Sequence, residues 1–341
     1  MDKRHILFIV NPISGVKKKT SVLKQIENGI DATHFTYEIV LTEYAGHAAE
    51  LAKKAAEEGV DIVVAVGGDG TVNEVARSLV HSNSALGIIP RGSGNGLARH
   101  LQIPMDVKKA LKIINQASIQ CLDYGKINGQ PFFCTCGVGF DAFVSLKFAE
   151  SGKRGPLSYV ENTLREGLRY QPDTYTIETE NGVTKHKAFL VACANASQYG
   201  NNVYIAPNAS MSDGLMDIII MEAFNTIESP QIILQLLNKT IDTNSHVKTI
   251  QAKKVRITRS TNGVAHCDGD FFMTGDTIDV ELIQKSFNVV VNPQARSTGQ
   301  SFKQIFMDYF NEWIELPNGI IKTKEDLIRI NKNILDKIKK L

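Results

Sequence analysis

The segment Val63–Glu74 reads VVAVGGDGTVNE, and it decides the fold of the chain. An apolar, β-branched run passes directly into two glycines, an acid and a third glycine, and a helical stretch follows. A parallel sheet binds ligands at the carboxyl ends of its strands, where a helix N-terminus presents free N–H groups to phosphate. Glycines let the backbone approach a phosphate closely, whereas an acid binds phosphate only through a cation or a hydroxyl donor. The segment therefore predicts a phosphate-binding turn in a parallel α/β domain.

Two more turns of this kind lie on either side of the segment. The run Leu86–Arg99 reads LGIIPRGSGNGLAR, in which a second apolar strand ends at a proline and a glycine-rich turn. The turn Asn11–Gly15 closes the first apolar run of the chain. The glycine spacing is not that of the dinucleotide-binding fingerprint, and the sequence contains no Walker A motif. Three polar turns on one sheet edge predict a nucleotide-binding cleft of another type.

The apolar runs around these turns predict a doubly wound, nucleotide-binding α/β domain at the N-terminus. Strands separated by helices of this length pair in parallel, and helices cover both faces of their sheet. The expected strands lie at 6–10, 37–41 and 62–66, and the expected helices at 23–30 and 47–58.

After about Cys121 the pattern changes to short alternating runs, which favour an antiparallel β-sandwich or barrel. Helices at 142–170 and 230–238 are expected to interrupt it. The expected strands lie at 132–137, 175–180, 188–194, 216–221, 255–258, 277–282 and 288–291.

The last forty residues return to helical spacing. Apolar positions at 302–313 and 327–338 recur every three to four residues among many lysines, which predicts two amphipathic helices. They either pack on the body of the protein or on a second subunit, which leaves a homodimer open, or lie on an anionic membrane.

Composition limits the class of protein. The 341 residues are too many for one ordinary domain, and 43% hydrophobic with 22% charged residues indicates a folded globular chain. The net charge is only +2, so nothing requires a nucleic-acid partner. Five cysteines without CxxC spacing favour structural thiols and a reducing cytoplasm. No stretch is apolar enough for a signal peptide or a membrane span, so we expect any contact with a membrane to be peripheral.

Taken together, the motifs of this chain resemble those of the diacylglycerol-kinase catalytic family, which includes bacterial lipid kinases and the sphingosine and ceramide kinases. The likeness runs over residues 5–293 in the order of the family. It is carried by Asn11–Pro12, Ser14–Gly15, Thr42, Gly46–Ala48, Gly67–Thr71, Pro90–Asn95, Leu122–Gly125, Cys136–Asp141, Asn195, Pro207–Ala209, Ser212–Asp217 and Asp268–Asp270.

The resemblance implies an ATP- and Mg²⁺-dependent lipid kinase with a cleft between two domains. The domains would be an ATP-binding α/β domain at 1–122, a β-sandwich lipid domain at 123–299 and a helical tail at 300–341. It implies a lipid substrate at the membrane surface, reached from the cytoplasm on the inner face. By position, the ATP site would be lined by Asn11, Thr42, Gly67, Gly68, Asp69, Gly70, Thr71, Val72, Asn73, Gly92, Ser93, Gly94 and Asn95.

The resemblance also suggests a base and a metal site. Phosphoryl transfer needs a carboxylate within reach of the attacking hydroxyl, and the family supplies it from an acidic Asp-Gly-Glu turn. Here that turn is Asp268–Gly269–Asp270, with Asp where Glu is usual, so we favour Asp270 as the base and keep Asp268 as the alternative. A structural Mg²⁺ would be held by the Asp213 carboxylate and the main-chain oxygens of Met216 and Ile218.

Two other functions stay open at this point. An NAD kinase shares the GGDGT turn and a similar domain plan, although the PRGSGN turn and Asn11–Pro12 argue against it. A non-catalytic nucleotide or lipid sensor would bind ATP without turnover. The sequence does not name the lipid, because acyl-chain pockets consist of interchangeable apolar residues.

Overall fold

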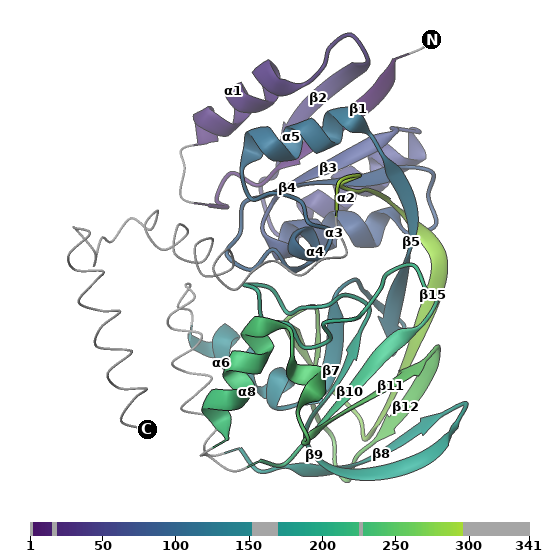
Figure 1. The fold of residues 1–341 in the computed structure, drawn as a ribbon. Helices are drawn as coiled ribbons and strands as arrows, with labels where there is room; N and C mark the ends of the chain where they lie inside the picture. Colours follow the sequence, from purple (N-terminus) through teal and green to yellow (C-terminus); the bar gives the residue numbers. More distant parts are fainter. Residues whose placement is uncertain (1–2, 16–18, 152–169, 225–227, 296–341) are drawn as a thin grey trace, which may run out of the picture. The chain divides into compact units, whose positions relative to one another are not determined.

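A computed structural model describes residues 3–15, 19–151, 170–224 and 228–295, all of which belong to one compact unit, residues 1–297. The two expected tail helices, and residues 152–169 of the helix expected at 142–170, lie outside the described residues. Among the described residues, helices and strands separate into an N-terminal α/β part and a mainly-β part (Figure 1). The expected fold class is confirmed for both of these parts.

The N-terminal part is built around four parallel strands in the order β2-β1-β3-β4. Their bounds are β1 Arg4–Val10, β2 Phe35–Leu41, β3 Ile62–Gly67 and β4 Ala85–Pro90. Every residue of β3 and β4 is buried, as expected for central strands of a parallel sheet with both faces covered. The surrounding helices are α1 Lys19–Gly29, α2 His47–Glu57, α3 Asp69–Leu79, α4 Gly96–His100 and α5 Val107–Gln116.

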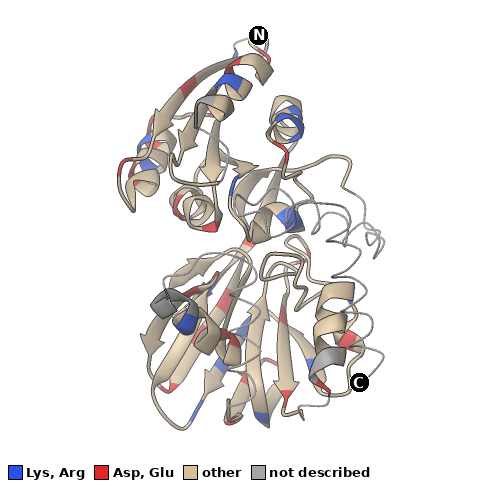
Figure 2. Ribbon diagram, turned by 90° about the vertical axis from the view of Figure 1, so that its left-hand side faces the viewer, with Lys and Arg blue, Asp and Glu red and all other residues tan. Residues whose placement is uncertain are grey.

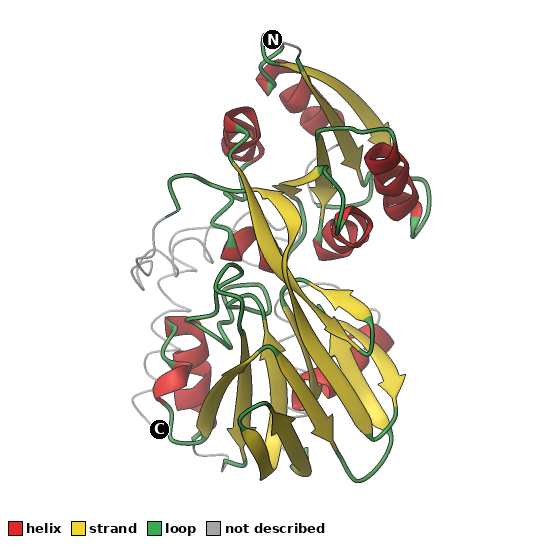
Figure 3. Cartoon of the chain, turned by 90° about the vertical axis from the view of Figure 1, so that its right-hand side faces the viewer, coloured by secondary structure: helices red, strands yellow, loops and turns green. Residues whose placement is uncertain are grey.

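The mainly-β part consists of antiparallel strands with helices against one side (Figure 3). A core of apolar side chains that includes Phe132, Tyr175 and Ile218 lies among these strands. Its strands are β6 Gln130–Phe132, β7 Thr135–Gly139, β8 Asp173–Thr179, β9 Gly182–Ala194, β10 Met216–Glu222, β11 Val247–Ala252, β12 Lys254–Thr258, β13 Gly263–Cys267 and β14 Asp270–Thr274. The helices are α6 Phe140–Ser151, α8 Ser229–Asn238 and the short 3₁₀ helix η1 Ile241–Thr243.

Two long antiparallel strands join the parts: β5 (Ile119–Ile127) leaves the α/β part, and β15 (Thr277–Val290) returns to it. Val289 of β15 pairs in parallel with Leu86 of β4, so the end of the described chain extends the N-terminal sheet. The strands expected at 277–282 and 288–291 are in fact one strand with an irregularity between Ile283 and Phe287. The domain boundary expected at residue 122 falls inside β5.

A buried carboxylate holds the irregular stretch of β15. Asp123 accepts a hydrogen bond from the backbone N–H of Lys285 (2.8 Å) and another from that of Gly214 (2.9 Å). Lys285 has a φ of 44°, outside the range of a regular strand, so its N–H needs a partner other than the sheet ladder. The Asp123 side chain is 1% exposed and supplies that partner.

The strand expected at 132–137 is divided for a similar reason. The backbone N–H groups of Phe133, Cys134 and Thr135 point to the carboxylate of Asp268 instead of a neighbouring strand. Periodicity shows an unbroken apolar run here, because it carries no information about where backbone N–H groups find acceptors.

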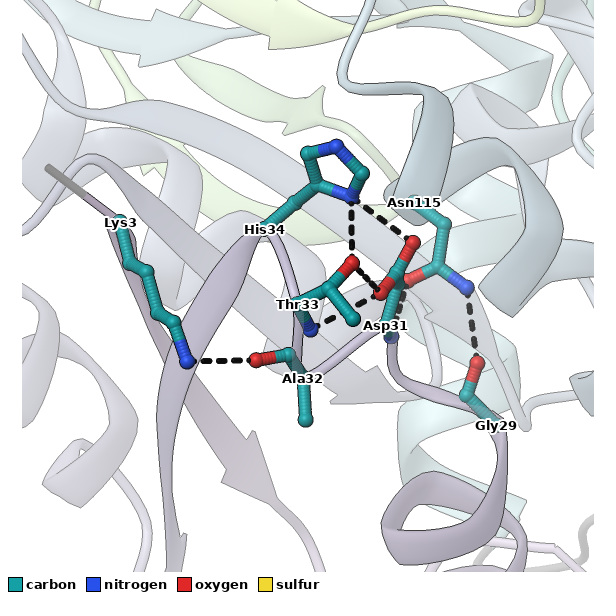
Figure 4. Close-up of polar contacts among 7 residues, drawn as sticks. All are labelled: Lys3, Gly29, Asp31, Ala32, Thr33, His34 and Asn115. Atoms are coloured by element: carbon teal, nitrogen blue, oxygen red, sulfur yellow. Dashed lines mark hydrogen bonds and ion pairs between the residues drawn. The ribbon is translucent and has the colours of Figure 1, made fainter. Parts of the chain in front are cut away.

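Another aspartate orders the turn between α1 and β2 (Figure 4). Hydrogen bonds from the Thr33 hydroxyl and from His34 lower the pKa of Asp31 from 3.8 to about 2. The side chain of Asn115, on α5, accepts from the Asp31 N–H and donates to the Gly29 carbonyl. These bonds tie the turn to α5.

The five cysteines are free thiols, and all except Cys121 are buried. Acidic and basic residues are interspersed along the described elements (Figure 2). Within the described ranges, no helix has both the length and the apolarity needed to cross a membrane.

Phe287 provides a test of the joint between the parts. Its ring is fully buried, and its centroid lies 4.7 Å from that of Phe133. Phe287→Ala should lower the free energy of unfolding by roughly 3–5 kcal/mol, because the β15–β5 joint would carry a cavity. Urea denaturation measures this loss. Phe271→Ala, at a side chain that is 38% exposed, is the matched control and should cost much less; equal losses would contradict the packing argument.

Candidate active site

The predicted polar turns lie at one edge of the parallel sheet. The Asn11 N–H donates to the Val66 carbonyl (3.0 Å), and the Arg91 N–H donates to the Gly67 carbonyl (2.7 Å). Thr42, just after β2, donates its N–H to the Val10 carbonyl (3.0 Å). The ends of all four parallel strands are therefore in register where a ligand would bind.

The two glycine-rich turns approach each other backbone to backbone. A Cβ atom added to Gly92 would lie 2.7 Å from the Cα of Gly68, and one added to Gly67 would lie 2.5 Å from the Thr71 side chain. A side chain at Gly92 would force the turns apart, and one at Gly67 would collide with the start of α3, because real Cβ contacts are not this short. Glycine is thus required here for close approach between segments of the chain as well as for access to a ligand.

The Asp69 carboxylate joins the two turns. Its two oxygens accept hydrogen bonds from the backbone N–H groups of Asn95 and Gly96, both at 2.8 Å. The sequence suggested a cation or a hydroxyl as the partner of this acid, but in the structure its partners are the N–H groups at the start of α4. A Cβ atom at Gly94 would lie 2.7 Å from the same carboxylate, which explains the glycine there.

Side-chain amides complete the turns. The Asn11 amide donates to the Thr71 hydroxyl (3.1 Å), which links the first turn to α3. Asn95 has a φ of 52° and bonds both the N–H and the carbonyl of Gly92, so it closes the PRGSGN turn on itself. Val72 and Asn73 are buried on α3, whereas Ser93 is exposed at the tip of its turn.

The mainly-β part contacts the same turn. The Gly94 carbonyl accepts from the N–H of Asn201 (3.1 Å) and from Nε of Arg99 (2.9 Å). A Cβ atom at Gly96 would meet the backbone of Tyr199 and Gly200 at 3.4 Å. The turn is therefore held between the two parts of the described unit.

The acidic turn between β13 and β14 places its two acids in different surroundings. Asp268 accepts three backbone N–H groups, from Phe133 (2.8 Å), Cys134 (2.7 Å) and Thr135 (3.1 Å). Burial raises the pKa of Asp268, while these donors and Arg77 oppose the rise. Its carboxylate is committed to holding the segment between β6 and β7.

Asp270, by contrast, is exposed, and its carboxylate accepts no hydrogen bond from the described residues. Partial burial raises the pKa of Asp270, the charge of Asp69 raises it further, and the Arg77 guanidinium lowers it. The charge of Asp69, on the first glycine-rich turn, therefore acts on this carboxylate.

The predicted metal residues lie away from this turn, at the start of β10. Asp213 is exposed, and its carboxylate accepts only the Leu215 N–H (3.1 Å) among the described residues. Met216 and Ile218 are fully buried in β10, and Ile218 pairs with β9 on one side and with β11 on the other. Burial and the nearby charge of Asp213 raise the pKa of Asp217.

Three parts of the site were not singled out from the sequence. Arg77 contacts the acidic turn from α3, and Asp123 anchors the turn that carries Asp213 through Gly214. The carboxylate of Asp141 lies 3.0 Å from Nε2 of His266 and accepts the Tyr199 hydroxyl (3.1 Å). Asp123 and Asp141 lie in motifs of the sequence that could have indicated them, whereas no motif contains Arg77.

Comparison with known proteins supports this arrangement. Residues 5–127 match the diacylglycerol kinase catalytic domain, and residues 134–290 match the YegS C-terminal NAD kinase beta sandwich-like domain. A diacylglycerol kinase of Bacillus subtilis is 27% identical over 268 residues, which are 77% of this chain and 88% of that protein.

Two solved structures share the fold. A diacylglycerol kinase from Bacillus anthracis aligns with a TM-score of 0.68 at 23% identity, over 86% of this chain and 98% of the other. An NAD kinase from Archaeoglobus fulgidus, in complex with ATP, aligns with a TM-score of 0.50 at 11% identity, over 89% and 98%.

The paired glycine turns and the facing β-sandwich define a kinase of the lipid kinase class. More specifically, the chain belongs to the diacylglycerol kinase family with a YegS-type C-terminal domain.

The joint between the turns is testable by adding one methyl group. Gly94→Ala places a Cβ against the Asp69 carboxylate and should lower the free energy of unfolding by about 1–3 kcal/mol. Gly70→Ala is the matched control, because a Cβ there meets nothing within 4 Å. Thermal unfolding of the two variants gives the comparison. Equal melting temperatures would mean that the turns are not packed as described.

Proposed function

We propose that this protein transfers the γ-phosphoryl group of ATP to the hydroxyl of a membrane lipid such as diacylglycerol, with Mg²⁺ and with Asp270 as the general base. The observation that carries the proposal is the contrast within the acidic turn: Asp268 accepts three backbone N–H groups, whereas the Asp270 carboxylate is exposed and accepts no hydrogen bond from the described residues. A base at this position can accept the proton of an acceptor hydroxyl beside a nucleotide held by the turns.

Different residues would bind the nucleotide, accept the proton and hold the acidic turn in place. The turns at Gly67–Asn73 and Gly92–Asn95, together with Asn11 and Thr42, would bind the nucleotide. Asp270 would take the proton from the lipid hydroxyl while the hydroxyl oxygen bonds to the γ-phosphorus. At the same time, the bond between the γ-phosphorus and the ADP oxygen would break. Mg²⁺, when bound with ATP, neutralises charge on the phosphate oxygens. Asp268 would support the base by fixing the turn.

For a structural Mg²⁺ the fit of the residues is mixed. The exposed Asp213 carboxylate, close enough to raise the pKa of Asp217, suits a hard cation that prefers oxygen ligands. Ile218, however, lies inside a strand that is paired on both sides, so the sheet competes for its carbonyl oxygen. The proposal therefore rests on Asp213 with Met216, and we give this cation no step in the transfer.

We further propose that the protein works in the cytoplasm, in peripheral contact with the inner face of the membrane, because its lipid substrate resides there. A homodimer stays an expectation. The fold of an NAD kinase is similar, so NAD is the alternative acceptor to be tested.

The reaction can be tested with labelled ATP and Mg²⁺ in the presence of a total lipid extract or of NAD. Label in a lipid product supports the proposal, and identification of that lipid names the substrate. Label in NADP would establish the alternative. ATP binding without any labelled product would indicate a nucleotide sensor and would contradict catalysis.

Substituting each acid in turn distinguishes the proposed base, Asp270, from the residue that holds the turn, Asp268. Asp270→Asn should lower kcat by at least about 100-fold while ATP binding and the melting temperature stay unchanged. Asp268→Asn should instead lower the free energy of unfolding by about 1–3 kcal/mol, because the amide cannot accept all three backbone donors. Wild-type rates in both variants would show that neither acid is the base.

The pH profile follows from the raised pKa of Asp270. A raised pKa means that the carboxylate is protonated at a higher pH than usual, so kcat/KM should fall as the pH drops through a midpoint above 3.8. Asp270→Glu, which introduces the acid usual in the family, should retain such an acidic limb. A wild-type profile that is flat down to pH 4 would contradict the assignment.

A further inference from the structure

Arg77 is the basic side chain of α3 that reaches the acidic turn. Its Nη2 donates to Sγ of Cys267 (3.6 Å), and the same Sγ donates to the Pro131 carbonyl (3.2 Å). Cys267 is the cross-strand partner of Asp270 and the chain neighbour of Asp268. Arg77 therefore contacts a residue that adjoins Asp268 in the chain and pairs with Asp270 across the hairpin.

The charges around Arg77 are mainly negative. Asp69 lies at the start of the same helix, and Asp268 and Asp270 lie on the turn opposite. Burial raises the pKa of Asp268, Asp270 and the Cys267 thiol, and the Arg77 guanidinium opposes the rise in each case. Three carboxylates with a triphosphate beside them would repel one another, and a guanidinium offsets this repulsion while its planar donors fix direction.

Arg77 also has an unused donor. Its Nε is buried and has no hydrogen-bond partner among the described residues. A buried N–H without an acceptor is costly, so the side chain is held in place at the expense of stability. A buried donor that stays unpaired calls for an explanation, and a catalytic role is one of them.

We propose that Arg77 is a positioning residue for phosphoryl transfer: through Cys267 it fixes the β13–β14 turn against α3 and presents the Asp270 carboxylate to the acceptor hydroxyl. The inference rests on the proposed function of Asp270. The proposal gives α3 a second role. The helix begins at the first glycine-rich turn, and it also carries Arg77, which contacts Cys267 beside the proposed base. Helix α3 would thereby set the position of the base relative to the bound nucleotide.

The test compares Arg77→Met with Arg77→Lys. Met keeps much of the length but removes charge and donors, and it should lower kcat about 10- to 100-fold with KM for ATP nearly unchanged. Lys restores the charge but not the planar donors, and it should recover part of the lost kcat. Arg256→Gln is the control: that exposed arginine pairs with Asp279 on β15 and is not part of the site, so its loss should leave kcat as it is.

Two outcomes would overturn the proposal. One is wild-type kcat in Arg77→Met. The other is equal impairment of the Met and Lys variants together with a lower melting temperature, which would mean that Arg77 acts by packing alone. The proposed function is tested separately, because its failure would show in the wild-type protein as absence of a labelled lipid, or in Asp270→Asn as full activity.

Discussion

The Asp69 carboxylate is the constraint on which the site depends. By accepting the N–H groups of Asn95 and Gly96, it joins the turn after β3 to the turn after β4. The glycines around it leave no room for any side chain between the two backbones. The two glycine-rich turns are therefore one preorganised unit, and preorganised groups of this kind need not move during a reaction.

Two other aspartates also accept hydrogen bonds from backbone N–H groups, beyond the parallel sheet. Asp123 serves the N–H groups of Lys285 and Gly214, and Asp268 serves three N–H groups between β6 and β7. Each one satisfies backbone donors at a place where strand pairing is interrupted. A carboxylate is suited to this work because it accepts several hydrogen bonds and binds them more strongly than a neutral acceptor.

The number of hydrogen bonds that each carboxylate accepts separates the proposed roles of the two acids in the Asp268–Asp270 turn. A carboxylate that already accepts three donors cannot readily take a proton from a substrate, whereas the exposed Asp270 can. The positive φ values of Asp268 (50°) and Gly269 (89°) turn the chain sharply enough to point neighbouring acids in different directions. Residue type alone could not have ranked them.

Periodicity and glycine spacing are local properties of the chain, and they were enough to predict the fold class and to locate the glycine-rich turns and the acidic turn. The fold was needed to show that Asp69 binds N–H groups, that 277–290 is one strand, and that Arg77 reaches Cys267. These facts depend on pairs of residues far apart in the chain. Their partners are set by packing and by the need to satisfy buried donors, and no local pattern records them.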